Sequence, residues 1–307
     1  MPAELLCMGE PMLEFNQLPP QADGRRLYLE GCGGDTSNAA VAASRHGASV
    51  GYITALGRDF AGDAFMALWA QERVDASTVR RSEQHPTGVY FVFHGPSGHE
   101  FLYYRQNSAA AAYTQADLPR DALAAARMLF VSGVSQGISA SAADAVFAAI
   151  EIVKRAGGVV AYDTNYRARL WPPPRAVAIM NAAIRQADYV FPGLDDAGAL
   201  LGLTEPDAIL DFYLRLGPKA VVLKMGEAGA CLATQDTRLR LPAHQVEAVD
   251  ATGAGDTFCG SFLARILAGD EPEDAARYAN VAAALKCTGY GAVAPIPRPE
   301  HVRAALG

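Results

Sequence analysis

Short apolar runs that favour β-strands alternate with longer segments of helical periodicity along most of this chain of 307 residues. The strand-like runs have the ranges 49–56, 128–133, 159–164, 188–193 and 219–226. The helical segments have the ranges 61–73, 141–157, 258–269 and 275–287, and "WPPPR" (171–175) is typical of a helix start. Apolar strands separated by helices of this length predict an α/β fold, in which a mostly parallel sheet is covered by helices on both faces.

Two regions interrupt this alternation. "PTGVYFVFHGPSGHEFLYYR" (86–105) has two strand-like runs joined by the turn-forming "HGPSGH" (94–99). The segment 12–30 is also extended, with no helical period. We expect both to form a small antiparallel flap, so that residues 1–307 make a single domain whose lid strands come from about 12–30 and 86–106.

Composition excludes several classes of function. No apolar run reaches the roughly 20 residues of a spanning helix, and the first ten residues lack a basic region followed by an apolar one. The net charge is −7, and Lys and Arg form no cluster with interleaved aromatics. We therefore expect a cytoplasmic protein that binds neither membrane nor nucleic acid.

The cysteines and histidines do not predict a structural metal site. The five cysteines lie far apart without a CxxC pair, which indicates reduced thiols. His85, His94 and His99 fall around the expected turn and lack companion ligands at metal-site spacing.

The stretch "DATGAGDTFCGSFLARILAG" (250–269) combines a glycine-rich loop, a carboxylate and an apolar helix. Gly253 and Gly255 let the backbone turn sharply, and a helix that begins near Gly255 adds unpaired N–H groups and a positive dipole end. Such a loop stabilises anionic oxygens, so Asp256 would repel a phosphate rather than bind it. A carboxylate there can instead take a proton from a hydroxyl that attacks the phosphate. The alternative role, an improved helix start, is worth about 0.3–1 kcal/mol.

A second helix start lies more than 200 residues earlier, in "GCGGDTSNAAVAASRHG" (31–47). Asp35 and Thr36 form its polar cap region, and the alanine-rich helix is expected to end at Gly47. The chain contains no GxxxxGK[ST] motif and no HRD or DFG set, which excludes P-loop kinases and the protein-kinase pattern.

Together these two motifs resemble those of the ribokinase-like (PfkB) carbohydrate kinases, and the resemblance extends over 8–299. It implies a doubly wound α/β fold with a β-stranded lid over the sugar, ATP and Mg²⁺ as cofactors, and it leaves a monovalent cation open. Asp256 matches the family's catalytic base, and the anion hole is matched by Gly253, Ala254 and Gly255. The nucleotide side is matched by Asn165, Lys224, Gly226, Gly229 and Asn280.

Within the family, the segments "GGDTSN", "FLYYRQNSAAA", "DTNYRARLW" and "GLDDAGALLG" are most similar to those of 2-keto-3-deoxygluconate kinases. In an extended strand Tyr103 and Arg105 project to the same face, where Arg105 could bind a substrate carboxylate with its planar fork. Tyr90 lies on the partner strand, and Arg167 follows the strand 159–164 at the end where parallel sheets bind ligands. The remaining expected substrate contacts are Gly33, Gly34 and Asn38.

The motifs leave alternatives open. Fructokinases share a similar lid arginine, and a non-catalytic sugar or nucleotide sensor could use the same fold, although binding alone does not require Asp256. The family's Asn-x-x-Glu is replaced by Gly193 and Asp196, so we expect Asp196 to contact magnesium only indirectly. Exposed lid strands favour a homo-oligomer. The sequence thus predicts a phosphotransferase that converts 2-keto-3-deoxygluconate to its 6-phosphate.

Overall fold

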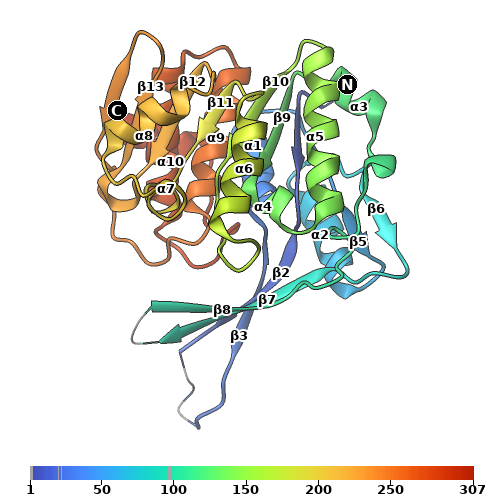
Figure 1. The fold of residues 1–307 in the computed structure, drawn as a ribbon. Helices are drawn as coiled ribbons and strands as arrows, with labels where there is room; N and C mark the ends of the chain where they lie inside the picture. Colours follow the sequence, from blue (N-terminus) through green and yellow to red (C-terminus); the bar gives the residue numbers. More distant parts are fainter. Residues whose placement is uncertain (1–2, 20, 22, 96–97) are drawn as a thin grey trace.

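A computed structural model of the chain describes residues 3–19, 21, 23–95 and 98–307. Its centre is an eight-stranded sheet of order β14-β13-β12-β11-β10-β9-β1-β4 (Figure 1). The strands are β1 (Leu5–Met8), β4 (Val50–Ile53), β9 (Met128–Ser132), β10 (Val159–Asp163), β11 (Tyr189–Phe191), β12 (Ala220–Lys224), β13 (Ala230–Ala233) and β14 (Arg238–Leu241). Pairing is parallel from β4 to β12 and antiparallel at β13 and β14. Since the chain extends from β1 in both directions, the predicted doubly wound sheet is confirmed.

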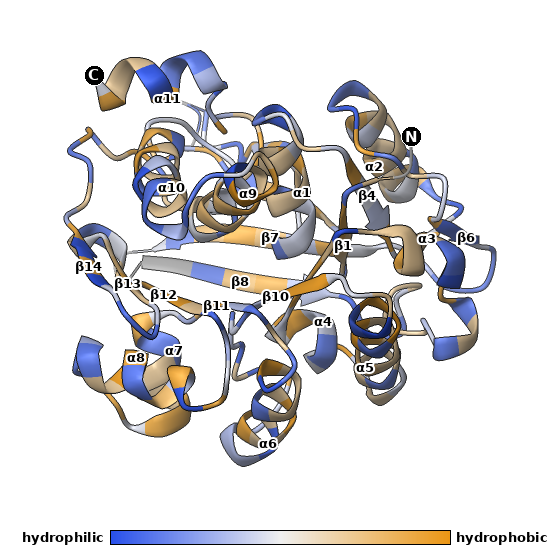
Figure 2. Cartoon of the chain, turned by 90° about the horizontal axis from the view of Figure 1, so that it is seen from above, coloured by the Kyte–Doolittle hydropathy of each residue, from blue (hydrophilic) through white to orange (hydrophobic). Residues whose placement is uncertain are grey.

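Helices cover both faces of this sheet, as the view from above shows (Figure 2). One face carries α1 (Asp35–Arg45), α2 (Phe60–Gln71), α9 (Ala254–Leu267) and α10 (Pro272–Lys286), with α11 (Pro299–Leu306) packed on α10. The other face carries α5 (Ala140–Arg155), α6 (Pro173–Ile184), α7 (Leu194–Leu201) and α8 (Pro206–Leu214). Short elements join these layers: β5 (Ala55–Gly57), β6 (Arg80–Ser82), α3 (Arg120–Ala125), α4 (Gly133–Gly137) and 3₁₀ turns at Gln115–Asp117 and Gly226–Ala228.

The strand β1 explains why the sheet needs both helical layers. All four of its residues are buried. Leu5 and Cys7 pack into the core beneath α1 and α9, whereas Leu6 and Met8 pack into the core beneath α5 and α6. Because side chains alternate along a strand, an entirely apolar strand must be covered twice.

The lid is a separate four-stranded sheet that projects from the α/β body (Figure 1). Its order is β3-β2-β7-β8, with β2 (Met12–Gln17), β3 (Tyr28–Gly33), β7 (Gly88–Gly95) and β8 (Gly98–Tyr104). The expected all-antiparallel arrangement is wrong at its centre, where β2 and β7 pair in parallel. Both strands leave the body in the same direction, and β3 and β8 return outside them. Part of the turn predicted at 94–99 falls on 96–97, outside the described residues.

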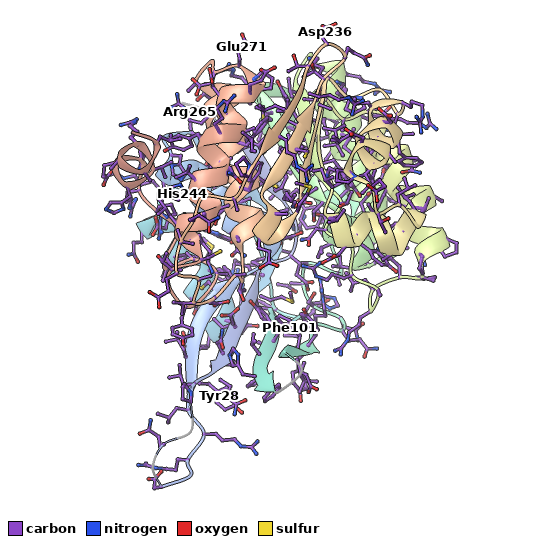
Figure 3. All side chains as sticks on the ribbon, turned by 90° about the vertical axis from the view of Figure 1, so that its left-hand side faces the viewer. Tyr28, Phe101, Asp236, His244, Arg265 and Glu271 are labelled. Atoms are coloured by element: carbon purple, nitrogen blue, oxygen red, sulfur yellow. The ribbon has the colours of Figure 1, made fainter. Side chains whose placement is uncertain are left out.

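The lid lies at one end of the molecule, as Figures 1 and 3 show. Figure 3 shows Tyr28 and Phe101 on the lid strands, while Asp236 and Glu271 lie at the opposite end of the body. In the described residues no helix is both long and apolar enough to cross a bilayer. All five cysteines are free.

Candidate active site

The loop before α9 is shaped to receive an anion. Gly253 caps the helix with φ of +78°, and a Cβ there would lie 2.9 Å from the carbonyl oxygen of Ala292. No acceptor within the described ranges takes the N–H groups of Gly255 and Asp256. Two unpaired N–H groups at the start of a fourteen-residue helix favour an anion, and the assignment of an anion hole to this loop stays a prediction.

The carboxylate of Asp250 holds this loop in place through hydrogen bonds. Its carboxylate accepts hydrogen bonds from the N–H of Thr252 (2.9 Å) and the N–H of Gly291 (2.8 Å). Burial works against ionisation, but these N–H groups hold the pKa of Asp250 below its usual range. The loop is therefore tied to the segment that follows α10.

Asp256 lies in the first turn of α9, where Asn38 of α1 donates a 2.8 Å hydrogen bond from Nδ2 to its Oδ2. The two helices can approach because a Cβ at Gly260 would lie only 2.2 Å from the carbonyl oxygen of Ala39. Burial, followed by the charge of Asp35, raises the pKa of Asp256 to about 7. A carboxylate with this pKa can both hold and release a proton near neutral pH.

Asp35 is a site residue that the sequence analysis treated only as a helix cap. Its Oδ2 accepts hydrogen bonds from Ser132 Oγ (2.5 Å) and Asn165 Nδ2 (2.8 Å). Asn165, expected on the nucleotide side, thus holds the carboxylate of Asp35, whose charge acts on Asp256. The signal available in the sequence was the acidic residue directly after the glycine pair in "GGDTSN".

Lys224 lies close to residues 250–255, the segment before α9 that we call the anion loop, and it already forms an ion pair. Its Nζ is 2.6 Å from Asp163 Oδ2, and a Cβ at Gly255 would lie 3.4 Å from the same Nζ. Burial opposes its charge, but Asp163 raises the pKa of Lys224 above its ordinary value. The ammonium therefore lies close to Gly255 and is neutralised by Asp163.

Two of the other residues that are expected on the nucleotide side, Gly229 and Asn280, contact one segment at the end of β14. Gly226 and Gly229 form the turn between β12 and β13, and a Cβ at Gly229 would lie 2.1 Å from the carbonyl oxygen of Leu241. Asn280 of α10 donates from Nδ2 to the carbonyl oxygen of Pro242 (2.8 Å). Gly229 and Asn280, more than 50 residues apart, therefore contact adjacent residues of one loop.

The lid brings four of the predicted substrate residues together. The rings of Tyr90 and Tyr103 stack at 5.7 Å, and the Arg105 guanidinium lies 5.8 Å from the Tyr103 ring centre. A Cβ at Gly33 would lie 2.2 Å from the Tyr90 hydroxyl oxygen, so the chain enters α1 directly against this wall. Gly34 follows as the residue before α1.

Two buried carboxylates of this wall were missed by the sequence analysis. Glu10 pairs with Arg105 Nη2 and accepts from the Ser108 hydroxyl, and Glu14 accepts from the Tyr90 hydroxyl. Burial raises the pKa of Glu10 and of Glu14. Within the described residues no acceptor takes the Nε or Nη1 of Arg105, which leaves the N–H donors of these two nitrogens for a ligand.

Arg167 does not join this wall. Its side chain is exposed, and its Nη1 donates to the neighbouring carbonyl oxygen of Tyr166 (2.9 Å). In the part of the chain that the structure describes, no polar contact connects it with Tyr90, Tyr103 or Arg105.

Asp196, the expected indirect magnesium contact, is held at the end of β10. Its Oδ2 accepts from Thr164 Oγ1 (2.8 Å), and the same hydroxyl lies 3.3 Å from the N–H of Gly193. The described residues contain no group of three or more His, Cys, Asp or Glu side chains arranged to hold a metal by themselves.

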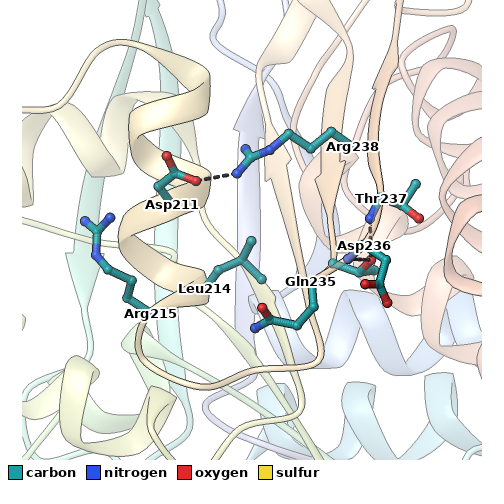
Figure 4. Close-up of a pocket in the computed structure, with 8 residues that line it drawn as sticks. Asp211, Leu214, Arg215, Gln235, Asp236, Thr237 and Arg238 are labelled. Atoms are coloured by element: carbon teal, nitrogen blue, oxygen red, sulfur yellow. Dashed lines mark hydrogen bonds and ion pairs between the residues drawn. The ribbon is translucent and has the colours of Figure 1, made fainter.

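A pocket of about 530 Å³ lies away from these residues, between α8 and the β13–β14 turn (Figure 4). Arg238 spans it with an ion pair to Asp211. Its lining is Asp211, Leu214, Arg215, Thr234, Gln235, Asp236, Thr237 and Arg238. None of these lining residues is one of the predicted site residues, and Asp236 lies at the end of the body opposite the lid (Figure 3).

Comparison with known proteins agrees with this geometry. The model of the pfkB family carbohydrate kinases matches residues 4–299. The chain belongs to this family. Its reaction class is therefore phosphoryl transfer to a sugar hydroxyl.

Two relatives and one solved structure show which kinases the chain is similar to. A 2-dehydro-3-deoxygluconokinase of Bacillus subtilis is 32% identical, over 91% of this chain and 87% of that protein. Fructokinase-1 of Oryza sativa is 30% identical, over 97% and 96%. A solved structure of a putative ribokinase II from E. coli, in complex with ATP and Mg²⁺, has a TM-score of 0.91 at 25% identity and covers 99% of both chains.

Proposed function

We propose that this chain uses ATP and Mg²⁺ to phosphorylate the terminal hydroxyl of 2-keto-3-deoxygluconate, giving the 6-phosphate. The observation that carries the chemistry is Asp256, a carboxylate with pKa raised to about 7 beside unpaired N–H groups at the start of α9. The observation that carries the substrate class is Arg105, a cation on the lid with free donors.

In this mechanism Asn38 holds one oxygen of Asp256, and the other oxygen takes the proton of the sugar hydroxyl. The N–H groups of Gly255 and Asp256 then stabilise the charge that grows on the transferred group. ATP supplies that group, and Mg²⁺ neutralises part of its charge. Mg²⁺ usually keeps several of its water ligands, and Asp196 Oδ2 already accepts from Thr164 Oγ1, so Asp196 would contact Mg²⁺ only indirectly.

The lid positions the acid end of the substrate. Arg105 is held between Glu10 and the ring of Tyr103, so its remaining N–H donors have a defined orientation. We assign Gly33, Tyr90 and Tyr103 to the sugar wall, and Arg167 remains a proposed contact that would have to turn inward.

Fructokinase activity is the second candidate. Glu10 already neutralises Arg105, and a site neutralised in this way accepts an uncharged sugar more readily than one with a free cation. The similarity to fructokinase-1 supports the same alternative.

The experiment that separates the two is the ratio of specificity constants for 2-keto-3-deoxygluconate and fructose, before and after Arg105→Met. Hydrogen bonds to charged groups contribute about 1.5–3 kcal/mol, so the variant should lose roughly ten- to a hundredfold for the sugar acid and less for fructose. Because Arg105→Met alone leaves Glu10 buried without its cation, the double variant with Glu10→Gln is the matched control. An unchanged ratio in both variants would favour the fructokinase.

We also propose a homo-oligomer that uses the lid face opposite Tyr90 and Tyr103. Phe15 stacks on Phe91 there (5.2 Å), and Leu102 and Tyr104 are 43% and 62% exposed. Light scattering of the protein and of Tyr104→Glu tests this, because a charge should dissociate an assembly that buries this face.

A further inference from the structure

Lys286, the last residue of α10, is a fully buried lysine without a direct carboxylate partner. Its relative exposure is 0%, and no acidic side chain in the described ranges lies within 4.0 Å of its Nζ. The contact that it makes is a 2.7 Å hydrogen bond from Nζ to the backbone carbonyl oxygen of Asp250. Lysines are almost never fully buried unless they are paired, so this position requires an explanation.

The partner carbonyl belongs to the residue that precedes the anion loop. The backbone N–H groups of Val249 and Asp250 donate to the carbonyl oxygen of Cys287 (2.7 and 3.1 Å). The Asp250 carboxylate in turn accepts from Thr252 and Gly291. Lys286 and the loop 250–255 are therefore one hydrogen-bonded unit.

Several carboxylates act on this ammonium from a distance. Burial lowers the pKa of Lys286, and the charges of Asp250, Glu14 and Asp256 oppose that effect. These groups come from the loop, from the lid strand β2 and from the first turn of α9. Lys224, a partly buried lysine of the site, is instead neutralised by direct contact with Asp163. Of these two lysines, Lys286 is therefore the one whose charge no carboxylate neutralises by direct contact.

We propose that Lys286 is a built-in cation that positions the anion loop and compensates charge there, so that turnover needs no added monovalent cation. A backbone carbonyl oxygen 2.7 Å away is a ligand that K⁺ or NH₄⁺ could also take. The tether keeps the charge in place without a binding equilibrium. This inference rests on the proposed role of Gly253, Ala254 and Gly255 in phosphate binding. Lys286 acts through the loop and is a positioning residue.

The test uses Lys286→Met in buffers of tetramethylammonium chloride, potassium chloride or ammonium chloride at one ionic strength. In tetramethylammonium, kcat should fall roughly ten- to a hundredfold, the scale of a lost hydrogen bond to a charged group, with a smaller change in the KM for sugar. Potassium or ammonium should restore a large part of the rate, because these ions are small enough to enter the vacated space. The rate of the unmodified enzyme should be the same in all three salts.

Lys154→Met is the matched control, since Lys154 is a half-buried lysine that pairs with Asp188 away from the loop. It should show no dependence on the cation. If Lys286→Met does not fold, Lys286→Gln keeps a donor to the Asp250 carbonyl without the charge, and the same salt series applies to it.

Calorimetric titration with ATP and Mg²⁺ keeps this inference separate from the choice of sugar. The variant should bind ATP more weakly in tetramethylammonium than in ammonium, whichever sugar the enzyme accepts. A failed sugar panel with this cation dependence intact would overturn only the proposed substrate. Normal turnover of the variant, a loss that no cation restores, or strong potassium activation of the unmodified enzyme would overturn the role of Lys286.

Discussion

Replacing Asp256 by asparagine removes a carboxylate whose pKa is raised from 3.8 to about 7 in the folded chain. The asparagine can still accept the hydrogen bond from Asn38 Nδ2, so the contact between α1 and α9 is kept. Asp256→Asn should lower kcat by about 10²–10⁴, the usual effect of a positioned base, and leave ATP and sugar binding in place.

The same substitution should stabilise the protein, with a sign set by proton linkage. The folded state binds the proton of Asp256 more tightly than the unfolded state, so the free energy of unfolding decreases as pH rises from about 4 to about 7. At 1.36 kcal/mol per pKa unit, the variant should exceed the unmodified protein by about 2 kcal/mol at pH 5.5 and by up to about 4 kcal/mol at pH 8.

Urea denaturation of both proteins at pH 5.5 and pH 8 measures this difference. In parallel, kcat/KM of the unmodified enzyme should fall as pH drops through about 7, with the slope expected for one proton. Near-normal turnover of Asp256→Asn would show that Asp256 is not the base and only stabilises the start of α9. A stability difference that is absent or shrinks with pH would refute the raised pKa.

Three further substitutions test the surroundings of the base. Gly255→Val should lower kcat more than the melting temperature, because a Cβ there lies 3.4 Å from Lys224 Nζ and a branched side chain would shift the loop that offers the unpaired N–H groups; normal activity per folded molecule with a collapsed melting temperature would make the loop structural. Lys224→Met should destabilise the fold by about 3–5 kcal/mol in urea denaturation, and adding Asp163→Asn should recover much of that loss; an unaltered midpoint in Lys224→Met would argue against a buried pair. Asp196→Ala should raise the Mg²⁺ concentration for half-maximal rate, measured by Mg²⁺ titration, and an unchanged value would remove Asp196 from the metal site.

The core sheet could be predicted from sequence because its strands are apolar on both faces. The four residues of β1 are all buried, and such runs stand out between amphipathic helices. The hairpin of β13 and β14 was not predicted, since "RLRL" alternates charged and apolar residues at an exposed edge. The parallel pairing of β2 with β7 also escaped, because two strands about 70 residues apart carry no local signal of direction.

For the site, helix starts could be predicted and the contacts between them could not. The glycines before α1 and α9 are local features with local consequences. The effect of Asp35 on Asp256 depends on the close approach that Gly260 permits, and 221 positions separate the two carboxylates (256 minus 35). Arg105 directly follows β8, and Glu10 lies shortly after β1. Their pairing depends in the same way on the tertiary fold, which hydrophobic periodicity does not predict.

The rate of ADP release by the unmodified enzyme is the most direct test of whether the protein is a sugar-acid kinase. Specificity constants should be measured with ATP and Mg²⁺ for 2-keto-3-deoxygluconate and for fructose under the same conditions. The constant should be higher for 2-keto-3-deoxygluconate, because its carboxylate can accept from the unpaired N–H donors of Arg105. A higher constant for fructose would contradict the sugar-acid assignment and identify the enzyme as a fructokinase.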